Sequence, residues 1–455
     1  MGSNCTKEYV MHITPHLGAK YRSNPRVASI RRSLVFGTTV VAAATALSGC
    51  NASAPGPDDK ITLTMWQQWG GGRERDVLDS LIERYEALHP NITIDESPVT
   101  NNAEILAAIT GGNAPDIVSL GNSLSLGSWA SVGAITDLTP FIEASGLDTS
   151  AYVQSSYNGL KVDGKTYALP FQVFNAGLIY NKQMFTDAGL TPPTTLEELA
   201  ITAQALTKTD SSGVITQLGF TPSYPGPDQG QTCPLITYGY AFGGIWTTND
   251  GMATPDSEEN VAALTWMRDV YAAVGGQQVT NFISSAGSYL TSDDPLESGK
   301  LAMVFDGPWS IQYTKENAPD VAKELGVIPL PASRTSPASA GSTYIDANPQ
   351  FIPTGSKNAQ AAFDFIAWET TNANEAATFS NEIANIPQLK TVPKYDLLDD
   401  VNYSAFVQIA NGPGARSWVQ TADSSTYGTN ICQAQDAVLL DGADPAEALA
   451  AVKTN

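Results

Sequence analysis

In two segments of the sequence, tryptophan stands close to amide or carboxylate side chains. Trp66 and Trp69 flank Gln67 and Gln68 just before three consecutive glycines, and a later segment reads Asp306-Gly307-Pro308-Trp309. A flat aromatic ring covers the apolar C–H face of a cyclic ligand, while amides and carboxylates pair with the hydroxyl groups at its rim. These residue types therefore predict a site that binds a hydroxyl-rich ring.

The first tryptophan pair follows a predicted strand. Residues 61–66 alternate apolar and polar side chains, whereas residues 77–88 carry apolar side chains at helical spacing. Ile92 and Ile94 indicate a second strand, residues 105–109 a helix, and residues 115–120 a third strand. This alternation predicts an α/β domain with a largely parallel sheet, and such sheets bind ligands at the carboxyl ends of their strands.

The same pattern continues through the rest of the chain. Residues 178–180 and the continuous apolar run at 301–305 predict buried strands, and residues 260–274 predict a helix. Thr195-Leu196-Glu197-Glu198 has the form of a capping box, and Asp444-Pro445-Ala446-Glu447 predicts the start of a last helix. A chain of 455 residues is long enough for two domains.

Histidine is too scarce to favour hydrolytic catalysis. His12 and His16 lie in the N-terminal leader, and His89, just before Pro90, is expected at a helix end. The sequence has no G-x-S-x-G segment for a serine nucleophile and no cysteine spacing typical of a zinc site. The interpretation is that the protein is not an enzyme and needs no cofactor or metal. A surface glycosidase with two carboxylates stays open as the alternative.

The N-terminal segment has the order of an export signal. Arg31-Arg32 precedes an uncharged, mostly apolar run at residues 34–46 and then Leu47-Ser48-Gly49-Cys50. The run is short for a membrane span, which favours a cleaved signal over residues 1–50. The order resembles bacterial lipoprotein signals, so we expect a lipid on Cys50, a tether at residues 51–60, and anchoring at the outer face of the cytoplasmic membrane. A general secretory signal and a twin-arginine route stay open.

Charge and cysteine content limit the partners. The net charge is −22, and without residues 1–50 the chain keeps 18 basic and 45 acidic residues, which gives −27. A surface this negative repels nucleic acid and anionic headgroups, and we expect a monomer held to the membrane only by its lipid. Cys233 and Cys432 form either one disulfide in an oxidising compartment or two buried thiols.

A series of segments in a fixed order resembles the extracellular solute-binding proteins of sugar ABC transporters (family 1, maltose-binding-protein-like). The resemblance covers residue 61 to the C-terminus. The segments are Leu169-Pro170-Phe171 and the run from Ile179 to Thr194, Glu297-Ser298-Gly299-Lys300-Leu301-Ala302-Met303, Asp306-Gly307-Pro308-Trp309, Gly326-Val327-Ile328-Pro329-Leu330-Pro331, Ser356-Lys357-Asn358, Ile386-Pro387 and Asp444-Pro445-Ala446-Glu447.

The resemblance implies a periplasmic-binding-protein type II fold, with two α/β lobes joined by hinge strands around a ligand cleft. By analogy, lobe 1 comprises residues 61–172 and 332–374, and lobe 2 comprises residues 173–331 and 375–455. Because the chain crosses between the lobes more than once, hinge closure would couple lobe rotation to ligand capture.

The resemblance and the strand ends together give the candidate ligand-binding residues. In the family, the position of Trp309 stacks on a sugar ring from the second lobe. Several alternatives stay open: Trp66 as a core aromatic, residues 119–123 as a polar turn, Asp306 as a cap, and the loop aromatics as gap fillers. The candidates are Trp66, Gln68, Trp69, Ser119, Asn122, Ser123, Phe174, Asn175, Tyr240, Trp246, Asp306, Trp309, Tyr344, Asp346 and Tyr427, with Trp418 as a further aromatic from the last segment.

The function implied is that of a receptor that captures a neutral carbohydrate, with an oligosaccharide expected, and delivers it to a permease with a cytoplasmic ATPase. None of the candidates is arginine or lysine, which argues against phosphorylated or carboxylated ligands. Gly121-Asn122-Ser123 and Phe174 depart from the maltose-binding pattern, so maltose is not carried over. A polyamine receptor stays open because Asp306 and Asp346 are among the candidates, and an iron receptor is the further alternative.

Overall fold

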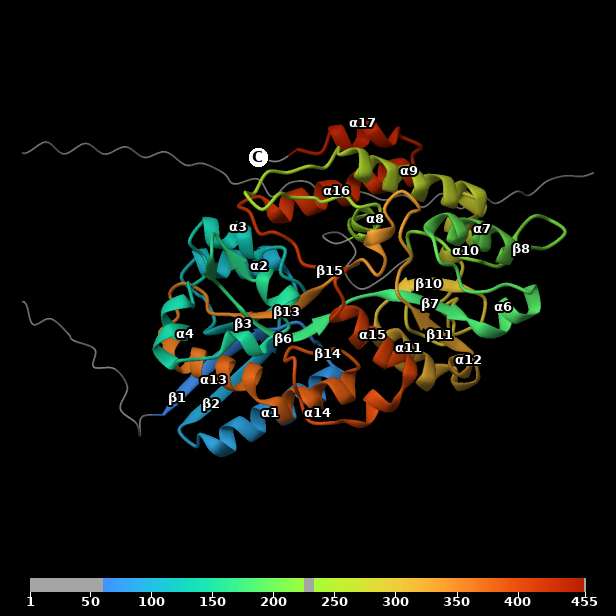
Figure 1. Cartoon of the computed structure of the whole chain (residues 1–455). Helices are drawn as coiled ribbons and strands as arrows, with labels where there is room; N and C mark the ends of the chain where they lie inside the picture. Colours follow the sequence, from blue (N-terminus) through green and yellow to red (C-terminus); the bar gives the residue numbers. More distant parts are fainter. Residues whose placement is uncertain (1–59, 225–232, 454–455) are drawn as a thin grey trace, which may run out of the picture. The chain divides into compact units, whose positions relative to one another are not determined.

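A computed structural model of the chain describes residues 60–224 and 233–453. The predicted export signal, Cys50 and the tether up to residue 59 lie outside the described residues. The described elements begin with strands and helices in alternation up to residue 131, and further strands and helices follow in mixed order (Figure 1). The α/β prediction is therefore confirmed for this part of the chain.

The larger sheet has six strands in the order β14-β6-β13-β3-β1-β2. β1 runs parallel to β2 and β3, while β13 is antiparallel to β3 and β6. In β1, Leu63 and Met65 are buried and Thr62 and Thr64 are exposed, which is the predicted alternation. The strands are β1 (Ile61–Gln67), β2 (Ile92–Pro98), β3 (Ile117–Ser119), β6 (Leu169–Phe174), β13 (Asp346–Phe351) and β14 (Ile386–Pro387).

Helices of the first lobe cover this sheet. α1 buries Leu78, Leu81, Ile82 and Tyr85, which are spaced three or four residues apart and so share one helix face. These side chains join one apolar core with residues of α13 and α14. The helices are α1 (Arg73–Leu88), α2 (Asn102–Thr110), α3 (Leu126–Ser131), α4 (Thr139–Ser145), α5 (Gln154–Asn158), α13 (Ala359–Thr371) and α14 (Ala373–Ile383), with the 3-10 turn η1 (Thr149–Ala151).

The second lobe has a three-stranded antiparallel sheet in the order β10-β7-β11. Its strands are β7 (Gly177–Asn181), β10 (Met303–Asp306) and β11 (Leu325–Ile328). Its helices are α6 (Lys182–Ala188), α7 (Leu196–Leu206), α8 (Pro234–Ala241), α9 (Glu258–Ala273), α10 (Gln277–Ser284), α11 (Pro308–Asn317), α12 (Pro319–Lys323), α15 (Val401–Ala410), α16 (Ser424–Leu439) and α17 (Pro445–Ala450).

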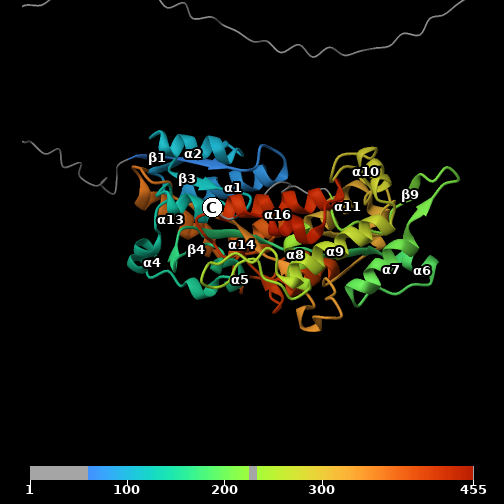
Figure 2. The same cartoon turned by 90° about the horizontal axis from the view of Figure 1, so that it is seen from above.

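The remaining elements are short. They form three two-stranded sheets and two 3-10 turns. The strands are β4 (Lys161–Val162) with β5 (Lys165–Thr166), β8 (Lys208–Thr209) with β9 (Ile215–Gln217), and β12 (Thr343–Tyr344) with β15 (Ala415–Arg416); the turns are η2 (Pro337–Ser339) and η3 (Asp396–Asp399). In Figure 2, first-lobe elements such as α1, α2 and α4 gather at the left, and α6, α7 and α10 at the right.

Both predicted helix starts occur in the structure. Asp444 accepts hydrogen bonds from the backbone N–H groups of Ala446 and Glu447 at the start of α17. Thr195 Oγ1 accepts from Glu198 N (3.1 Å), as in a capping box. The Glu198 carboxylate, however, accepts from Thr194 N (2.9 Å) and Thr194 Oγ1 (2.7 Å), so the return bond reaches one residue further back than the motif predicts.

The boundary between the lobes differs from the expectation after Asn374. Residues from 375 on were expected in lobe 2, but α14 and β14 belong to the first lobe. The Phe379 ring lies 4.7 Å from the Phe171 ring of β6, and β14 pairs with β6. The return to lobe 2 comes instead before α15, which packs against β11 and α11. Hydrophobic contacts, rather than sequence position, decide which lobe this segment joins.

Cys233 and Cys432 form a disulfide in the structure, one of the two alternatives left open. Cys233 is the N-cap of α8 and Cys432 lies in α16; their Cα atoms are 5.5 Å apart, and 199 residues separate them along the chain. The bridge therefore joins the last long helix to the middle of the chain.

We expect removal of this disulfide to lower the melting temperature. A cross-link that closes a loop this long restricts the unfolded chain and is worth about 2–4 kcal/mol, which corresponds to roughly 3–5 °C for a chain of this size. Calorimetry with and without reductant measures the change. The double variant Cys233→Ser with Cys432→Ser must melt like the reduced wild type, and an unchanged melting temperature would contradict a stabilising role.

Candidate ligand-binding site

A cavity of about 260 Å³ lies where residues of both lobes meet. The first lobe contributes residues that follow β1 and β3 and residues near β13 and α14, and the second lobe contributes α11 and the loop before β10. Phe174 comes from the end of β6, where the chain first crosses. The lining residues are Gln68, Trp69, Glu74, Gly121, Phe174, Leu290, Trp309, Tyr313, Asn348, Ile383 and Asn385.

Gln67 fixes the first wall of the cavity. This side chain is fully buried, and its Nε2 donates to Trp69 O and to Glu96 Oε2, both at 2.8 Å, while its Oε1 accepts from Trp69 N. The Trp69 ring packs against the Phe379 ring, with 5.6 Å between the ring centroids. The backbone after β1 therefore turns sharply, which brings Gln68 and Trp69 to the cavity.

Asn348 provides an open hydrogen-bond acceptor in the same wall. The residue is only 4% exposed, and its Nδ2 donates to Gly121 O (3.2 Å). Among the described residues, its Oδ1 has no hydrogen-bond partner. Buried polar atoms are rarely left without a partner, so this oxygen suits a donor group of a ligand.

Trp309 forms the facing wall from the first turn of α11. Pro308 occupies the first helical position, and the Trp309 ring lies directly over Gly307, where any Cβ atom would overlap it. Trp309 Nε1 donates to Tyr289 Oη at 2.6 Å, and the ring edge meets Phe174 at a centroid distance of 6.4 Å. Close backbone approach and a hydrogen bond thus fix the ring orientation.

Asp306 turns its carboxylate away from the cavity and into its own lobe. Its oxygens accept hydrogen bonds from Gly307 N (2.7 Å), Tyr289 Oη and Ser310 Oγ. Burial raises the pKa of Asp306 to about 6, although these three donors act in the opposite direction. Asp306 was considered either as a partner of ligand hydroxyl groups or as a cap of the following turn. Its hydrogen bonds join groups within the lobe and none of them faces the cavity.

Side chains of the two lobes meet at the mouth of the cavity. Tyr313 Oη of α11 donates to Glu74 Oε1 of α1 at 3.0 Å. Arg73 forms an ion pair with Glu316, and its guanidinium lies 5.0 Å from the centre of the Tyr313 ring. These contacts exist only while the lobes are together, so they favour the closed arrangement.

We expect Tyr313→Phe to speed ligand release. The variant loses the hydrogen bond to Glu74 but keeps the ring under Arg73, and a bond of this kind is worth about 0.5–1.5 kcal/mol, or roughly 2- to 10-fold in the off-rate. Stopped-flow fluorescence measures the rate. Arg268→Ala, which removes an exposed ion pair to Asp269 within one helix, is the control, and an unchanged off-rate in Tyr313→Phe would contradict the role of the mouth contact.

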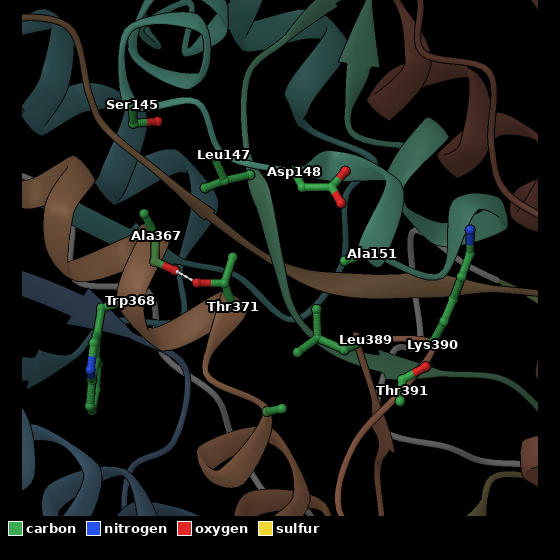
Figure 3. A pocket seen from close by; sticks show the side chains of 11 residues that line it. Ser145, Leu147, Asp148, Ala151, Ala367, Trp368, Thr371, Leu389, Lys390 and Thr391 are labelled. Carbon is green, nitrogen blue, oxygen red and sulfur yellow. Dashed lines mark hydrogen bonds between the residues drawn. The ribbon is translucent and has the colours of Figure 1, made fainter.

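A larger cavity of about 590 Å³ belongs entirely to the first lobe (Figure 3). Its walls are mostly apolar, with Leu147, Trp368 and Leu389 among them. Lys390 reaches outward to Ser150 O at 2.9 Å. Because all its walls belong to one lobe and move together, lobe closure cannot seal this cavity around a ligand. The interlobe cavity is the better candidate site.

The model of the family described as "Bacterial extracellular solute-binding protein" matches residues 71–376, which is more than half of the chain. The chain belongs to this family. A solved relative, "CpMnBP1 with Mannobiose Bound", is 28% identical to this solute-binding protein with a TM-score of 0.75, covering 86% of this chain and 98% of that one. The fold is the periplasmic-binding-protein type II fold, as predicted.

Curated relatives point in the same direction. The Maltotriose-binding protein of Pyrococcus abyssi is 24% identical over 335 residues, covering 70% of this chain but only 65% of the relative. The Galactooligosaccharide-binding protein of Bacillus subtilis is 22% identical over 337 residues, covering 71% of this chain and 72% of the relative. In the described part of this solute-binding protein, every helix is too short or too polar to cross a membrane.

Four of the candidate ligand-binding residues of this solute-binding protein lie in the interlobe cavity: Gln68, Trp69, Phe174 and Trp309. Two more lie near the strand ends without lining it. Trp66 packs in a first-lobe apolar cluster, and Asn122 Oδ1 accepts from Leu124 N (3.1 Å) within its turn. Trp66 therefore matches the alternative role of a core aromatic, and Asn122 matches that of a residue in a polar turn.

Five further candidates are buried away from the lining, and three of them form a polar cluster. Ser123 N donates to Asp346 Oδ2 (2.9 Å), Tyr344 Oη donates to the same oxygen (2.5 Å), and Ser119 is fully buried in β3. Asn175 Nδ2 donates to Phe406 O (3.1 Å). Burial raises the pKa of the Asp346 carboxyl. Ser123 N, Tyr344 and Asp346 are thus paired within the protein, whereas Ser119 Oγ and Asn175 Oδ1 have no hydrogen-bond partner among the described residues. None of the five residues lines the cavity.

The remaining aromatic candidates lie in the core of the second lobe. Trp246 Nε1 donates to Ile236 O (2.9 Å), Tyr427 Oη donates to Trp246 O (2.6 Å), and Tyr240 and Trp418 are buried in the same cluster. In these positions the aromatic side chains fill gaps, which was the alternative considered for them.

Seven lining residues were not among the candidate ligand-binding residues, although one of them, Gly121, lies in the strand-end segment 119–123 that supplied three candidates. Their signals are weak because they lie within helices or strands, or beside them, and are common residue types; Glu74, for example, resembles any acidic residue in the first turn of a helix. Only the meeting of two lobes makes them neighbours. They are Glu74, Gly121, Leu290, Tyr313, Asn348, Ile383 and Asn385.

Proposed function

We propose that this solute-binding protein captures a neutral carbohydrate in the interlobe cavity and delivers it to the permease of an ABC importer. The observation that carries the proposal is the lining itself. Trp69, Phe174 and Trp309 offer aromatic surface around one cavity, and the amides of Gln68, Asn348 and Asn385 stand among them. Aromatic faces with convergent amides match the C–H faces and hydroxyl groups of a sugar ring.

Charge supports a neutral ligand. Glu74 is the only charged residue of the described lining, and one of its oxygens accepts from Tyr313. An anionic ligand would lack a basic partner there. A polyamine needs several carboxylates, but Asp306 and Asp346 bind donors of the protein instead of facing the cavity. A glycosidase would need two carboxylates across the scissile bond, and the lining supplies one.

The size of the cavity favours a short carbohydrate. Its volume of about 260 Å³ lies just below the roughly 300–1,000 Å³ usual for small-molecule sites. Relatives carry names that refer to maltotriose and mannobiose. We therefore propose a mono- or oligosaccharide of few rings, with any longer chain extending through the mouth between the lobes.

A thermal-shift screen of the purified protein tests the proposal. The panel contains mannobiose, maltotriose, galacto-oligosaccharides, monosaccharides, polyamines and ferric citrate. A ligand that binds only the folded state raises the melting temperature with its concentration. We expect a response to one group of sugars and recovery of that sugar unchanged. A response to polyamines alone, or hydrolysis of the sugar, would overturn the proposal.

We further propose that the protein is exported and held at the outer face of the membrane by a lipid on Cys50. The support is the sequence order at residues 31–50 together with the extracellular character of the family. Acyl labelling of cells that produce the wild type or Cys50→Ala tests this. Label in the wild type and none in the variant is expected, whereas equal labelling of both would contradict the proposal.

A further inference from the structure

A continuous set of hydrogen bonds lies behind Trp309. Trp309 Nε1 donates to Tyr289 Oη at 2.6 Å, and Tyr289 Oη lies 3.0 and 2.9 Å from the two oxygens of Asp306. Ser310 Oγ and Gly307 N also donate to this carboxylate. The ring that forms one wall of the cavity is thus connected to a carboxylate within the lobe.

The direction of these bonds follows from the groups themselves. An indole N–H can only donate, so Tyr289 Oη must accept from Trp309 and direct its own proton to Asp306. Every described neighbour of the Asp306 oxygens is a donor, and an ionised carboxylate accepts from all of them. If Asp306 took up a proton, one donor would face another donor, and the set would have to rearrange.

The neighbours of the Asp306 carboxylate are hydrogen-bond donors or carry no side chain, so Asp306 acts as the hydrogen-bond acceptor. Across the sheet it pairs with Gly177 of β7, which has no side chain, and from α11 the Ser310 hydroxyl donates to it. From the loop before β10, Tyr289 is the titratable group in contact, and burial raises the pKa of Tyr289 well above its ordinary value, so the hydroxyl keeps its proton.

Three further titratable groups lie beyond this first contact. Tyr224 Oη donates to Asp294 Oδ1 at 2.7 Å, and Glu297 lies beside Asp294. Burial, followed by the charge of Asp294, raises the pKa of Glu297 to about 8, so Glu297 keeps its proton in mild acid. Among the described residues, no salt bridge reaches Asp294, Glu297 or Asp306.

We propose that Tyr289 and Asp306 are positioning residues that hold the ring of Trp309 for ligand, and that ligand affinity depends on ionisation of Asp306. The proposal rests on the proposed function, because it assigns Trp309 a role in binding. Affinity is complete while Asp306 is ionised and falls as the pH falls through its pKa. That pKa, raised by burial to about 6, lies within reach of mild acid outside a cell.

The first test needs no ligand. Protein labelled with ¹⁵N-tryptophan is titrated from pH 5 to 8 by NMR, and Trp309→Phe identifies the Trp309 indole signal. We expect that signal to move with a midpoint near pH 6 in the wild type and to stay constant in Asp306→Asn. A pH-independent signal in the wild type would overturn the proposal. If Asp306→Asn does not fold, Tyr289→Phe replaces it, with the same expectation.

The second test measures the affinity for mannobiose, or for the sugar found in the screen, between pH 5 and 8. We expect about 10-fold weaker binding at pH 5 than at pH 7.5 in the wild type. Tyr289→Phe should bind more weakly at pH 7.5 and lose the pH dependence. Tyr271→Phe, which removes a hydroxyl bonded to Thr280 in the same lobe, is the matched control and should keep the wild-type profile.

The outcomes separate the two proposals. A sugar that binds equally well from pH 5 to 8, in the wild type and in Tyr289→Phe, would overturn the positioning role and leave the proposed function intact. If the wild type binds no sugar, the proposed function fails, while the NMR titration still decides whether Asp306 controls the environment of Trp309.

Discussion

Trp309→Ala is expected to weaken carbohydrate binding by about 30- to 150-fold. The ring forms one wall of the interlobe cavity, and its orientation is fixed by Gly307 beneath it and Tyr289 at its nitrogen. Truncation of a buried aromatic anchor typically costs about 2–3 kcal/mol, and each 1.4 kcal/mol is tenfold in affinity. The second lobe would then keep Tyr313 as its only aromatic contact in the described lining.

Isothermal titration calorimetry with the sugar from the screen measures this effect. Trp368→Ala is the matched control, because Trp368 is a partly buried tryptophan that lines the separate first-lobe cavity. The control should bind like the wild type. Equal affinity of Trp309→Ala and Trp368→Ala would show that the sugar does not use the interlobe wall.

Glu369→Gln is expected to raise stability at pH values above the ordinary glutamate pKa of about 4.3. Glu369 is fully buried in α13, and neither of its carboxyl oxygens has a hydrogen-bond partner among the described residues. Burial, followed by the charge of Glu375, raises its pKa well above the ordinary value. The folded state therefore holds a proton that the unfolded state releases, and stability falls as the pH rises between the unfolded and the folded pKa.

The change of the unfolding free energy with pH gives the size of this effect. One extra proton in the folded state costs about 1.4 kcal/mol of stability per pH unit across that interval. Glu297 acts in the same direction up to about pH 8, because burial raises its pKa as well. Urea unfolding at pH 5.5 and pH 8 should show a smaller difference for Glu369→Gln than for the wild type. Glu382→Gln, on the exposed surface, serves as the control, and equal slopes in all three proteins would contradict the prediction.

The local elements were readable from the sequence because they depend on near neighbours. Alternation at residues 61–66 predicted β1, and Asp444 followed by Pro445 predicted the start of α17. The order of family segments predicted the two-lobed fold. The same information pointed to Trp69 and Trp309, because one follows a strand end and the other follows Gly307-Pro308 at the start of a helix.

The tertiary structure decided which lobe a segment joins and which aromatic side chains reach the cavity. The buried face of α14 was compatible with either core until Phe379 packed on Phe171. Trp246, like Trp309, stands two residues after a glycine in the sequence, yet its Nε1 donates to Ile236 O inside the lobe. Sequence patterns report which side chains are buried or turned outward, but contacts such as Tyr313 with Glu74 join residues 239 positions apart and arise only when two folded lobes meet.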